Sequence, residues 1–151
     1  MKSTRTAVLA LALATLAAAP LARAGMDDDV RQLQRDWEEI KYRKPATEQE
    51  KAYEALSQNA GAVRTKYADR AEPEIWYGII VASYAGDQAA AHSCYEQALA
   101  LARARGVRSD EANVLTYLAI GCQRAGDMLG ARDLLAQSLE IARELGDVGS
   151  M

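Results

Sequence analysis

The sequence predicts an all-α protein made of about six helices arranged as antiparallel helical hairpins. Residues 86–101 and 126–141 resemble each other at a spacing of 40 residues. Apolar residues recur at three- and four-residue steps along much of the chain, which is the period of a helix face. No segment shows the alternating β-branched pattern with hairpin turns that is typical of strands. A fixed period of this length predicts stacked supersecondary units, because one unit alone cannot bury its apolar face.

The two similar segments share eight identical positions in the same register. Both begin with Gly-Asp, and each is followed by Ala-Arg and then by Gly three residues later. The matched pairs are Gly86/Gly126, Asp87/Asp127, Ala91/Ala131, Gln97/Gln137, Leu99/Leu139, Ala102/Ala142, Arg103/Arg143 and Gly106/Gly146.

Residues 1–24 have the pattern of a secretory signal peptide. Lys2 and Arg5 precede an uncharged Ala/Leu-rich run over 7–19, and Ala22-Arg23-Ala24 provides small residues at a cleavage site. The run has about 13 residues, whereas a membrane span needs roughly 20, so a removed signal is favoured over an anchor. We expect cleavage after Ala24 and export to a bacterial periplasm, with secretion as the alternative.

The charge of the exported chain argues against a nucleic-acid partner. Loss of residues 1–24 lowers the count of Lys and Arg from 18 to 15 against 21 acidic residues, a net charge of about −6. Nucleic acid and anionic lipid both need a basic footprint. We therefore expect no nucleic-acid binding and no membrane insertion once the signal is removed.

A first hairpin is expected over residues 25–70. Asp27 to Asp29 place acidic side chains at the positive end of a helix dipole, and Pro45 ends that helix. Thr47 and Glu50 have capping-box spacing at the start of the second helix. The two apolar faces are Val30, Leu33, Trp37 and Ile40, then Ala52, Leu56, Ala60, Val63 and Tyr67.

Two further hairpins are expected over residues 71–151. Pro73 suits the first turn of the third helix, and Gly106 suits the end of the fourth. Ser109 can cap the fifth helix, Gly126 ends it, and the sixth helix is expected to end at Gly146. The apolar faces of these helices include Ile75, Trp76, Ile79, Ile80, Tyr84, Ala91, Cys94, Tyr95, Ala98, Leu99, Ala102, Val114, Leu115, Leu118, Ala119 and Cys122.

Residues 115–139 resemble a tetratricopeptide repeat (TPR) in their large-small-large spacing. The matching residues are Leu115, Leu118, Ala119, Cys122, Gly126, Asp127, Ala131, Leu135, Ser138 and Leu139. Residues 75–101 are a poorer match, because Gly78 falls where the family has a large apolar residue, and the period is 40 rather than the family's usual 34. The resemblance implies a short TPR-like α-solenoid with repeats over about 73–106 and 110–146.

The sequence offers no recognisable catalytic, cofactor or metal constellation. His92 is the only histidine, and we expect it to be a surface or partly buried packing residue. Without a second His or a close Cys/Asp/Glu group, no metal geometry is indicated. The Gly-Asp pairs are expected to be turns between helices, not phosphate loops.

Cys94 and Cys122 are the only cysteines, and both lie on expected apolar faces. A disulfide is conceivable in an oxidising compartment, but it needs Cβ atoms about 4 Å apart. The alternative is two separate thiols that pack as small hydrophobes.

The resemblance implies a concave face built from the first helix of each hairpin. It assigns Trp76, Ile80 and Ser83 to this face in one repeat, and Asn113, Thr116, Ile120, Gln123 and Arg124 in the next. The alternative is that Trp76 and the tyrosines pack between helices. Binding of a peptide's C-terminal carboxylate is not expected, since the family's clamp needs Lys and Asn where this chain has Thr116 and Ile120.

The sixth helix carries more apolar residues than one stripe needs. They are Leu134, Leu135, Leu139, Ile141, Ala142 and Leu145. We expect one stripe to pack on the fifth helix and the face around Leu134, Ile141 and Leu145 to dock another subunit, either a second copy or an envelope partner. The alternative is that the N-terminal hairpin or the chain tail covers it.

Together these patterns favour an exported helical-repeat module that binds a protein or peptide and has no catalytic activity or cofactor. The alternative is a structural or accessory subunit of an envelope complex. An enzyme with an unrecognised site is the third interpretation.

Overall fold

All the regular structure that this computed structural model describes, over residues 25–84 and 87–148, is α-helical. An N-terminal helix covers residues 25–43, and five helices follow. They are α2 (Ala46–Lys66), α3 (Ala71–Tyr84), α4 (Gln88–Arg105), α5 (Arg108–Ala125) and α6 (Met128–Val148). The predicted all-α class is therefore confirmed. The expected signal peptide, residues 1–24, lies outside the described residues.

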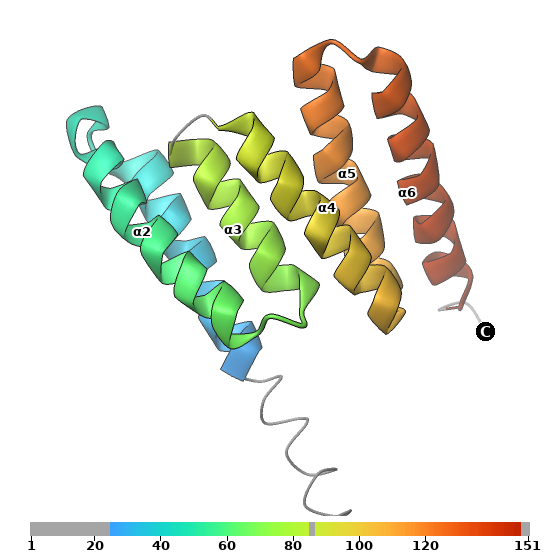
Figure 1. The fold of residues 1–151 in the computed structure, drawn as a ribbon, viewed down its shortest axis with the longest axis horizontal. Helices are drawn as coiled ribbons and strands as arrows, with labels where there is room; N and C mark the ends of the chain where they lie inside the picture. The colour runs from blue at the N-terminus through green and yellow to red at the C-terminus, as the bar shows by residue number, and fades with distance from the viewer. Residues whose placement is uncertain (1–24, 85–86, 149–151) are drawn as a thin grey trace, which may run out of the picture.

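The helices stand side by side, and each packs on the next one along the chain (Figure 1). The N-terminal helix lies behind α2 in this view, and α2 to α6 follow across the molecule. The inner helices α3 and α5 also touch each other. Among the described residues, no helix is both long enough and apolar enough to cross a membrane.

Two clusters of buried side chains form the core, and α3 contributes to both. The first cluster joins the N-terminal helix, α2 and α3 through Leu33, Ile40, Tyr53, Leu56, Ala60, Val63 and Ile80. The second joins α3, α4 and α5 through Ala71, Ile75, Ala91, Tyr95, Ala98, Ala102, Val114 and Leu118. Small alanines dominate the second cluster, which allows α3, α4 and α5 to approach closely.

Turns at equivalent places in the 40-residue period have the same construction. Asp87 Oδ1 accepts a hydrogen bond from Ala90 N at 2.9 Å, and Asp127 Oδ1 accepts one from Gly130 N at 2.9 Å. Each carboxylate caps a helix N-terminus, as short polar side chains do. The helices α4 and α5 end in glycines with φ of 67° and 85°, at Gly106 and Gly126. The expected helix ends at these two glycines are confirmed.

Three sequence-based boundaries differ from the structure. Helix α2 begins at Ala46 after Pro45, with no side-chain cap hydrogen bond, so Thr47 is not its N-cap. Val107, rather than Ser109, occupies the N-cap position of α5. Helix α6 continues through Gly146 to Val148, so the expected end at Gly146 is wrong.

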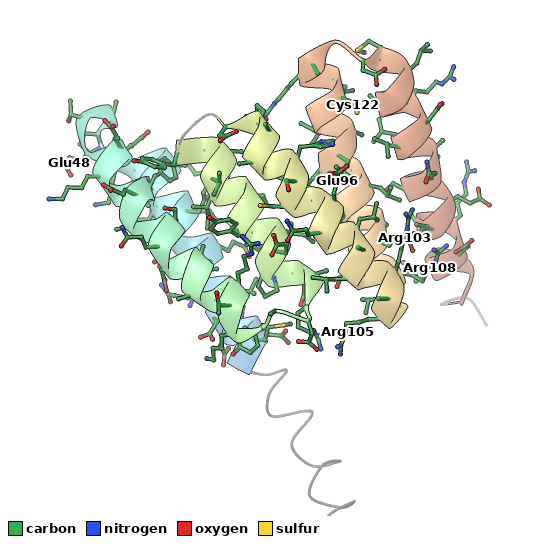
Figure 2. All side chains as sticks on the ribbon, in the orientation of Figure 1. Glu48, Glu96, Arg103, Arg105, Arg108 and Cys122 are labelled. Atoms are coloured by element: carbon green, nitrogen blue, oxygen red, sulfur yellow. The ribbon has the colours of Figure 1, made fainter. Side chains whose placement is uncertain are left out.

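Ion pairs tie neighbouring helices together at one edge of the molecule. The N-terminal helix, α3 and α5 begin at this edge, and each carries acidic residues near its start. Helices α2 and α4 end at the same edge with basic residues. Acidic residues at helix starts and basic residues at helix ends both interact favourably with the helix dipole. Arg103, Arg105 and Arg108 lie toward this edge (Figure 2). The pairs are Asp29–Lys66, Arg64–Glu74, Asp69–Arg105, Arg103–Glu111 and Arg108–Glu144.

Candidate functional site

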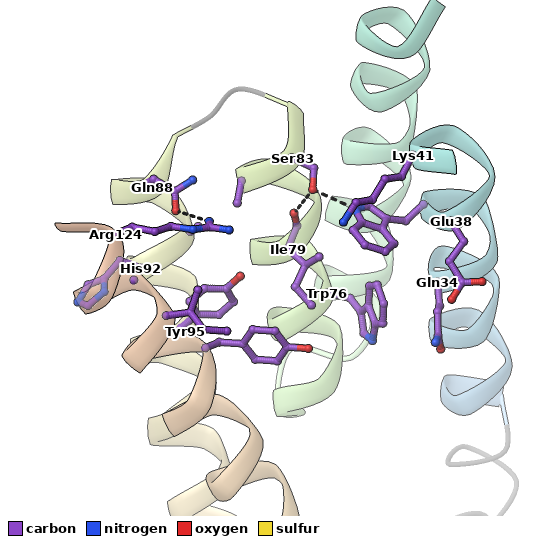
Figure 3. A pocket seen from close by; sticks show the side chains of 16 residues that line it. Gln34, Glu38, Lys41, Trp76, Ile79, Ser83, Gln88, His92, Tyr95 and Arg124 are labelled. Atoms are coloured by element: carbon purple, nitrogen blue, oxygen red, sulfur yellow. Dashed lines mark hydrogen bonds between the residues drawn. The ribbon is translucent and has the colours of Figure 1, made fainter. Parts of the chain in front are cut away.

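The main candidate site is a groove that crosses the N-terminal helix, α3, α4 and α5. Its volume is about 490 Å³. Figure 3 shows Gln34, Glu38 and Lys41 on one side and Gln88, His92 and Arg124 on the other, with Ile79 and Tyr95 between them. The remaining lining residues are Trp37, Trp76, Ala82, Ser83, Ala91, Tyr117, Ile120 and Gly121.

Four aromatic rings give the groove its apolar surface. Trp37 and Trp76 meet edge to face with ring centroids 6.1 Å apart, and Tyr95 and Tyr117 stack with centroids 5.4 Å apart. Both arrangements are favourable for aromatic quadrupoles. The first pair joins the N-terminal helix to α3, and the second joins α4 to α5, so the rings also hold the walls of the groove together.

Hydrogen bonds fix the polar side chains of the groove. Trp37 Nε1 donates to Ser83 Oγ at 2.9 Å, and Ser83 Oγ donates to the carbonyl oxygen of Ile79 at 2.9 Å. Arg124 Nη1 donates to Gln88 Oε1 at 3.0 Å on the opposite side. The Ser83 hydroxyl is therefore engaged with an indole and a backbone carbonyl, not with a side-chain base.

Two cationic side chains, Lys41 and Arg124, lie on opposite sides of this aromatic surface (Figure 3). Lys41 Nζ lies 4.2 Å from the centroid of the Trp37 ring, a cation–π contact.

Burial, helped by the neighbouring Tyr117, raises the pKa of Tyr95 to about 12, and burial also raises the pKa of Tyr117. Both phenols stay neutral at physiological pH and can donate hydrogen bonds to a ligand.

Four of the eight residues expected on the concave face line this groove. They are Trp76, Ser83, Ile120 and Arg124. Asn113 and Gln123 are exposed but lie outside the groove lining.

Two of the eight assignments are wrong. Ile80 is fully buried in the cluster with Leu33 and Leu56, so it faces the core. Thr116 faces α6, because its Oγ1 lies 3.1 Å from Ser138 Oγ. The helical register explains both errors, since one residue of displacement rotates a side chain by about 100° around its helix.

The sequence contained a signal for the part of the groove that was missed. On α5 the lining residues are Tyr117, Ile120, Gly121 and Arg124, an i, i+3, i+4, i+7 stripe that a helical wheel would identify. The contributions of Gln34, Trp37, Glu38 and Lys41 depend on how the N-terminal helix packs, and no motif in the sequence fixes that packing.

The structure also places the two cysteines and the histidine of the chain. Cys94 is buried, Cys122 is half-buried, and both are free thiols, so no disulfide joins them in this structure. His92 is exposed at the groove, with Nε2 3.6 Å from Glu96 Oε1. No group of three or more His, Cys, Asp or Glu side chains within the described ranges could hold a metal ion.

The expected docking face on α6 is wrong for Leu134 and Ile141, whereas Leu145 is exposed as expected. Ile141 is only 4% exposed, and Leu134 packs against the cluster that holds Val114 and Leu118. These residues form the stripe that faces the body of the protein. The exposed apolar residues of the helix are Met128, Leu129, Leu135, Leu139 and Leu145.

Comparison with known proteins finds no family model, curated protein or solved structure that matches the chain.

Proposed function

We propose that this protein is an exported helical-repeat module of the TPR type that binds an extended peptide segment of another protein in the groove. The single observation that carries the proposal is the groove itself, which brings four aromatic rings and several hydrogen-bonding side chains together from four helices. Ligand sites are concave and mostly apolar, with a few polar groups that fix orientation.

The shape and chemistry of the groove favour an extended chain with an apolar anchor. The rings of Trp76, Tyr95 and Tyr117 can cover an inserted apolar side chain, and Gln34, Gln88 and Ser83 can contact backbone amides. Aromatic side chains provide contact area at low entropic cost, because they have only two rotatable bonds. Lys41 shares its side of the groove with Glu38, whereas the lining of the opposite side carries Arg124 and no carboxylate, so an acidic side chain near Arg124 is favoured.

Both tryptophans of the chain line the groove, and this gives a direct test. A displayed library of random linear peptides is selected on the purified protein, and each enriched peptide is titrated while tryptophan emission is recorded. We expect enriched peptides to shift the emission and to lose affinity by about tenfold or more on Ile120→Glu, which places a charge at an exposed apolar residue of the groove lining.

Leu129→Glu is the matched control, since Leu129 is also an exposed apolar residue but lies outside the groove. It should leave the affinity unchanged. A selection that enriches nothing, or peptides that bind Ile120→Glu as well as the unchanged protein, would contradict the proposal.

The periplasmic location is part of the same proposal and depends on residues 1–24. N-terminal sequencing of the exported protein should begin at Gly25. An intact Met1 on a membrane-bound product would overturn it.

An accessory-subunit role is the second candidate, and one observation favours it. Helix α6 exposes several leucines, which suits a fixed contact with another protein.

A further inference from the structure

Helices α4 and α6 are equivalent in the 40-residue period, but they differ in how many neighbours cover them. Helix α4 packs between α3 and α5, whereas α6 packs only on α5 among the described helices. Figure 1 shows α6 at one end of the row. Helix α6 therefore exposes the surface that, on α4, binds the following helix.

The exposure of equivalent apolar residues measures this difference. Tyr95 on α4 is 8% exposed, and its equivalent Leu135 is 39% exposed. Ala102 is 1% exposed, whereas Ala142 is exposed. Leu99 is half-buried, whereas Leu139 is 51% exposed. On α4, these positions belong to, or pack against, a cluster that α4 forms with α3 and α5 and that includes Val114 and Leu118 of α5.

A charged position shows the same contrast. Arg103 at the end of α4 donates from Nε to Glu111 Oε1 in the first turn of α5, at 2.9 Å. Its equivalent on α6 is Arg143, which is exposed and forms no ion pair with any described residue. The free surface of α6 thus has an apolar stripe and, at one end of it, a cation that pairs with no carboxylate among the described side chains.

We propose that this surface, formed by Leu135, Leu139, Ala142 and Arg143, binds an amphipathic helix of another protein in the position that α5 occupies on α4. The bound helix runs antiparallel to α6. It carries an acidic residue in its first turn opposite Arg143 and apolar residues three and seven positions later, as Glu111, Val114 and Leu118 do in α5. This is helix recognition through i, i+3 and i+7 anchors.

A second copy of the chain fits this surface poorly. An antiparallel pair of α6 helices centred between Leu135 and Leu139 brings Arg143 of each copy close to Arg132 of the other. Arg143 then meets another arginine, whose own partner Asp133 is already engaged at 3.0 Å, instead of an unpaired carboxylate. The N-terminal helix of a second copy offers acidic residues, but its aliphatic residues Leu33 and Ile40 are already buried. Another protein with an acidic amphipathic helix is therefore the occupant that matches in both charge and apolar pattern.

The test uses the full chain and a peptide that copies residues 107–126, with Cys122→Ala. A lactam bridge between positions 109 and 113, which are both exposed on α5, holds the peptide helical, and circular dichroism verifies this. Binding of the labelled peptide is measured by fluorescence anisotropy. We expect saturable binding that Leu139→Glu and Arg143→Glu in the protein each weaken by about tenfold or more.

Three controls make the result specific to this surface. Gln137→Glu lies about 200° around α6 from Leu139 and should leave binding unchanged. A peptide carrying Glu111→Arg should recover affinity for the Arg143→Glu protein, because the charge pair is restored in reverse. Ile120→Glu in the groove should have no effect, so failure of the groove proposal and failure of this one are distinguishable.

Two results would overturn the proposal. One is a helical peptide that does not bind, or that binds Leu139→Glu as well as the unchanged protein. The other is sedimentation of the full chain as a dimer that Leu139→Glu converts to a monomer, because a second copy would then be the occupant.

Discussion

Tyr95 of α4 occupies the space that a side chain at Gly78 of α3 would need. A Cβ atom on Gly78 would lie 2.8 Å from Tyr95 Cε1 and 3.2 Å from the Cβ of Cys94. Gly78 was the position that departs from the TPR pattern, where a large apolar residue is usual. In this chain the large side chain comes from the opposite helix, and the glycine allows α3 and α4 to approach closely.

Gly78→Ala should therefore destabilise the protein despite the higher helix propensity of alanine. Alanine gains about 1 kcal/mol over glycine within a helix. Displacing a buried ring and a neighbouring Cβ costs about 1–3 kcal/mol, and we expect a net loss of about 1 kcal/mol in the free energy of unfolding. Urea denaturation measures it.

Gly61→Ala on α2 is the matched control. A Cβ there would lie 3.7 Å from Tyr77 Cε2, which is ordinary van der Waals contact. The free energy of unfolding of this variant should increase by up to about 1 kcal/mol from helix propensity alone. If both substitutions stabilise the protein equally, the close approach at Gly78 is not a constraint.

Ala131 is a small buried residue of α6, the helix that packs on α5. It is 1% exposed, as is its repeat equivalent Ala91. Ala131→Leu should overpack this buried site and lower the free energy of unfolding by about 1–3 kcal/mol. Ala136→Leu on the exposed side of α6 should change stability by less than about 0.5 kcal/mol. Thermal melts that rank the two variants in the opposite order would contradict the register of α6.

The two cysteines should differ in reactivity toward a thiol reagent. Burial, together with the nearby Glu74 carboxylate, raises the pKa of the Cys94 thiol to about 11. At pH 8, on the order of one Cys94 side chain in a thousand is then a thiolate, which is the reactive form. Cys122 is less buried and should react first.

A colorimetric thiol assay on Cys94→Ala and Cys122→Ala separates the two rates. We expect one fast thiol in the folded protein and two after denaturation. Detection of no free thiol in the exported protein would instead indicate a disulfide between these residues.

The sequence was sufficient for the all-α class, because several helix ends recur at equivalent places in the repeat. Asp87 and Asp127 cap their helices in the same way, and Gly106 and Gly126 adopt the left-handed conformation that closes a helix. Gly146 copies Gly106 in sequence, but its helix continues. The turn at Gly106 leads into α5, which packs on α4, and no described helix follows Gly146 to stabilise such a turn.

The groove was only partly predictable, because it depends on packing between helices. Trp76 and Arg124 were assigned to it from the repeat pattern. Trp37 and Lys41 could not be assigned, because the N-terminal hairpin carries no recognisable motif. On α6, the stripes through Ile141 and Leu139 are both apolar in sequence. Only the structure shows that Ile141 is buried and Leu139 is exposed.

Two buried glutamates should give the stability of the protein opposite pH dependences. Hydrogen bonds from Arg103, and then from Arg108, lower the pKa of Glu111 despite its burial. Burial raises the pKa of Glu74, and the nearby Arg64 offsets this only in part. Arg64 Nε lies 2.6 Å from Glu74 Oε2, whereas Glu74 Oε1 is buried and has no hydrogen-bond partner that meets normal geometry.

The sign of each effect follows from proton linkage. Glu111 has a lower pKa in the folded than in the unfolded protein, so it contributes stability above about pH 4.3, and this is lost as the pH falls through its folded pKa. Glu74 has a higher pKa in the folded protein. The folded state therefore loses stability as the pH rises from about 4.3 through the folded pKa of Glu74.

Glu111→Gln should lower the free energy of unfolding by about 1–3 kcal/mol at pH 7, and this loss should shrink as the pH is lowered toward 3.5. Glu74→Gln should show the opposite pH dependence. Its free energy of unfolding should increase relative to that of the unsubstituted protein as the pH rises from acid to neutral. Urea denaturation across this pH range, with exposed Glu140→Gln as the background, measures both differences. Opposite pKa shifts require that the two stability differences change with pH in opposite directions. If both change in the same direction, the assignment of Glu111 as a stabilising carboxylate and of Glu74 as a carboxylate whose charged form is disfavoured by burial is wrong.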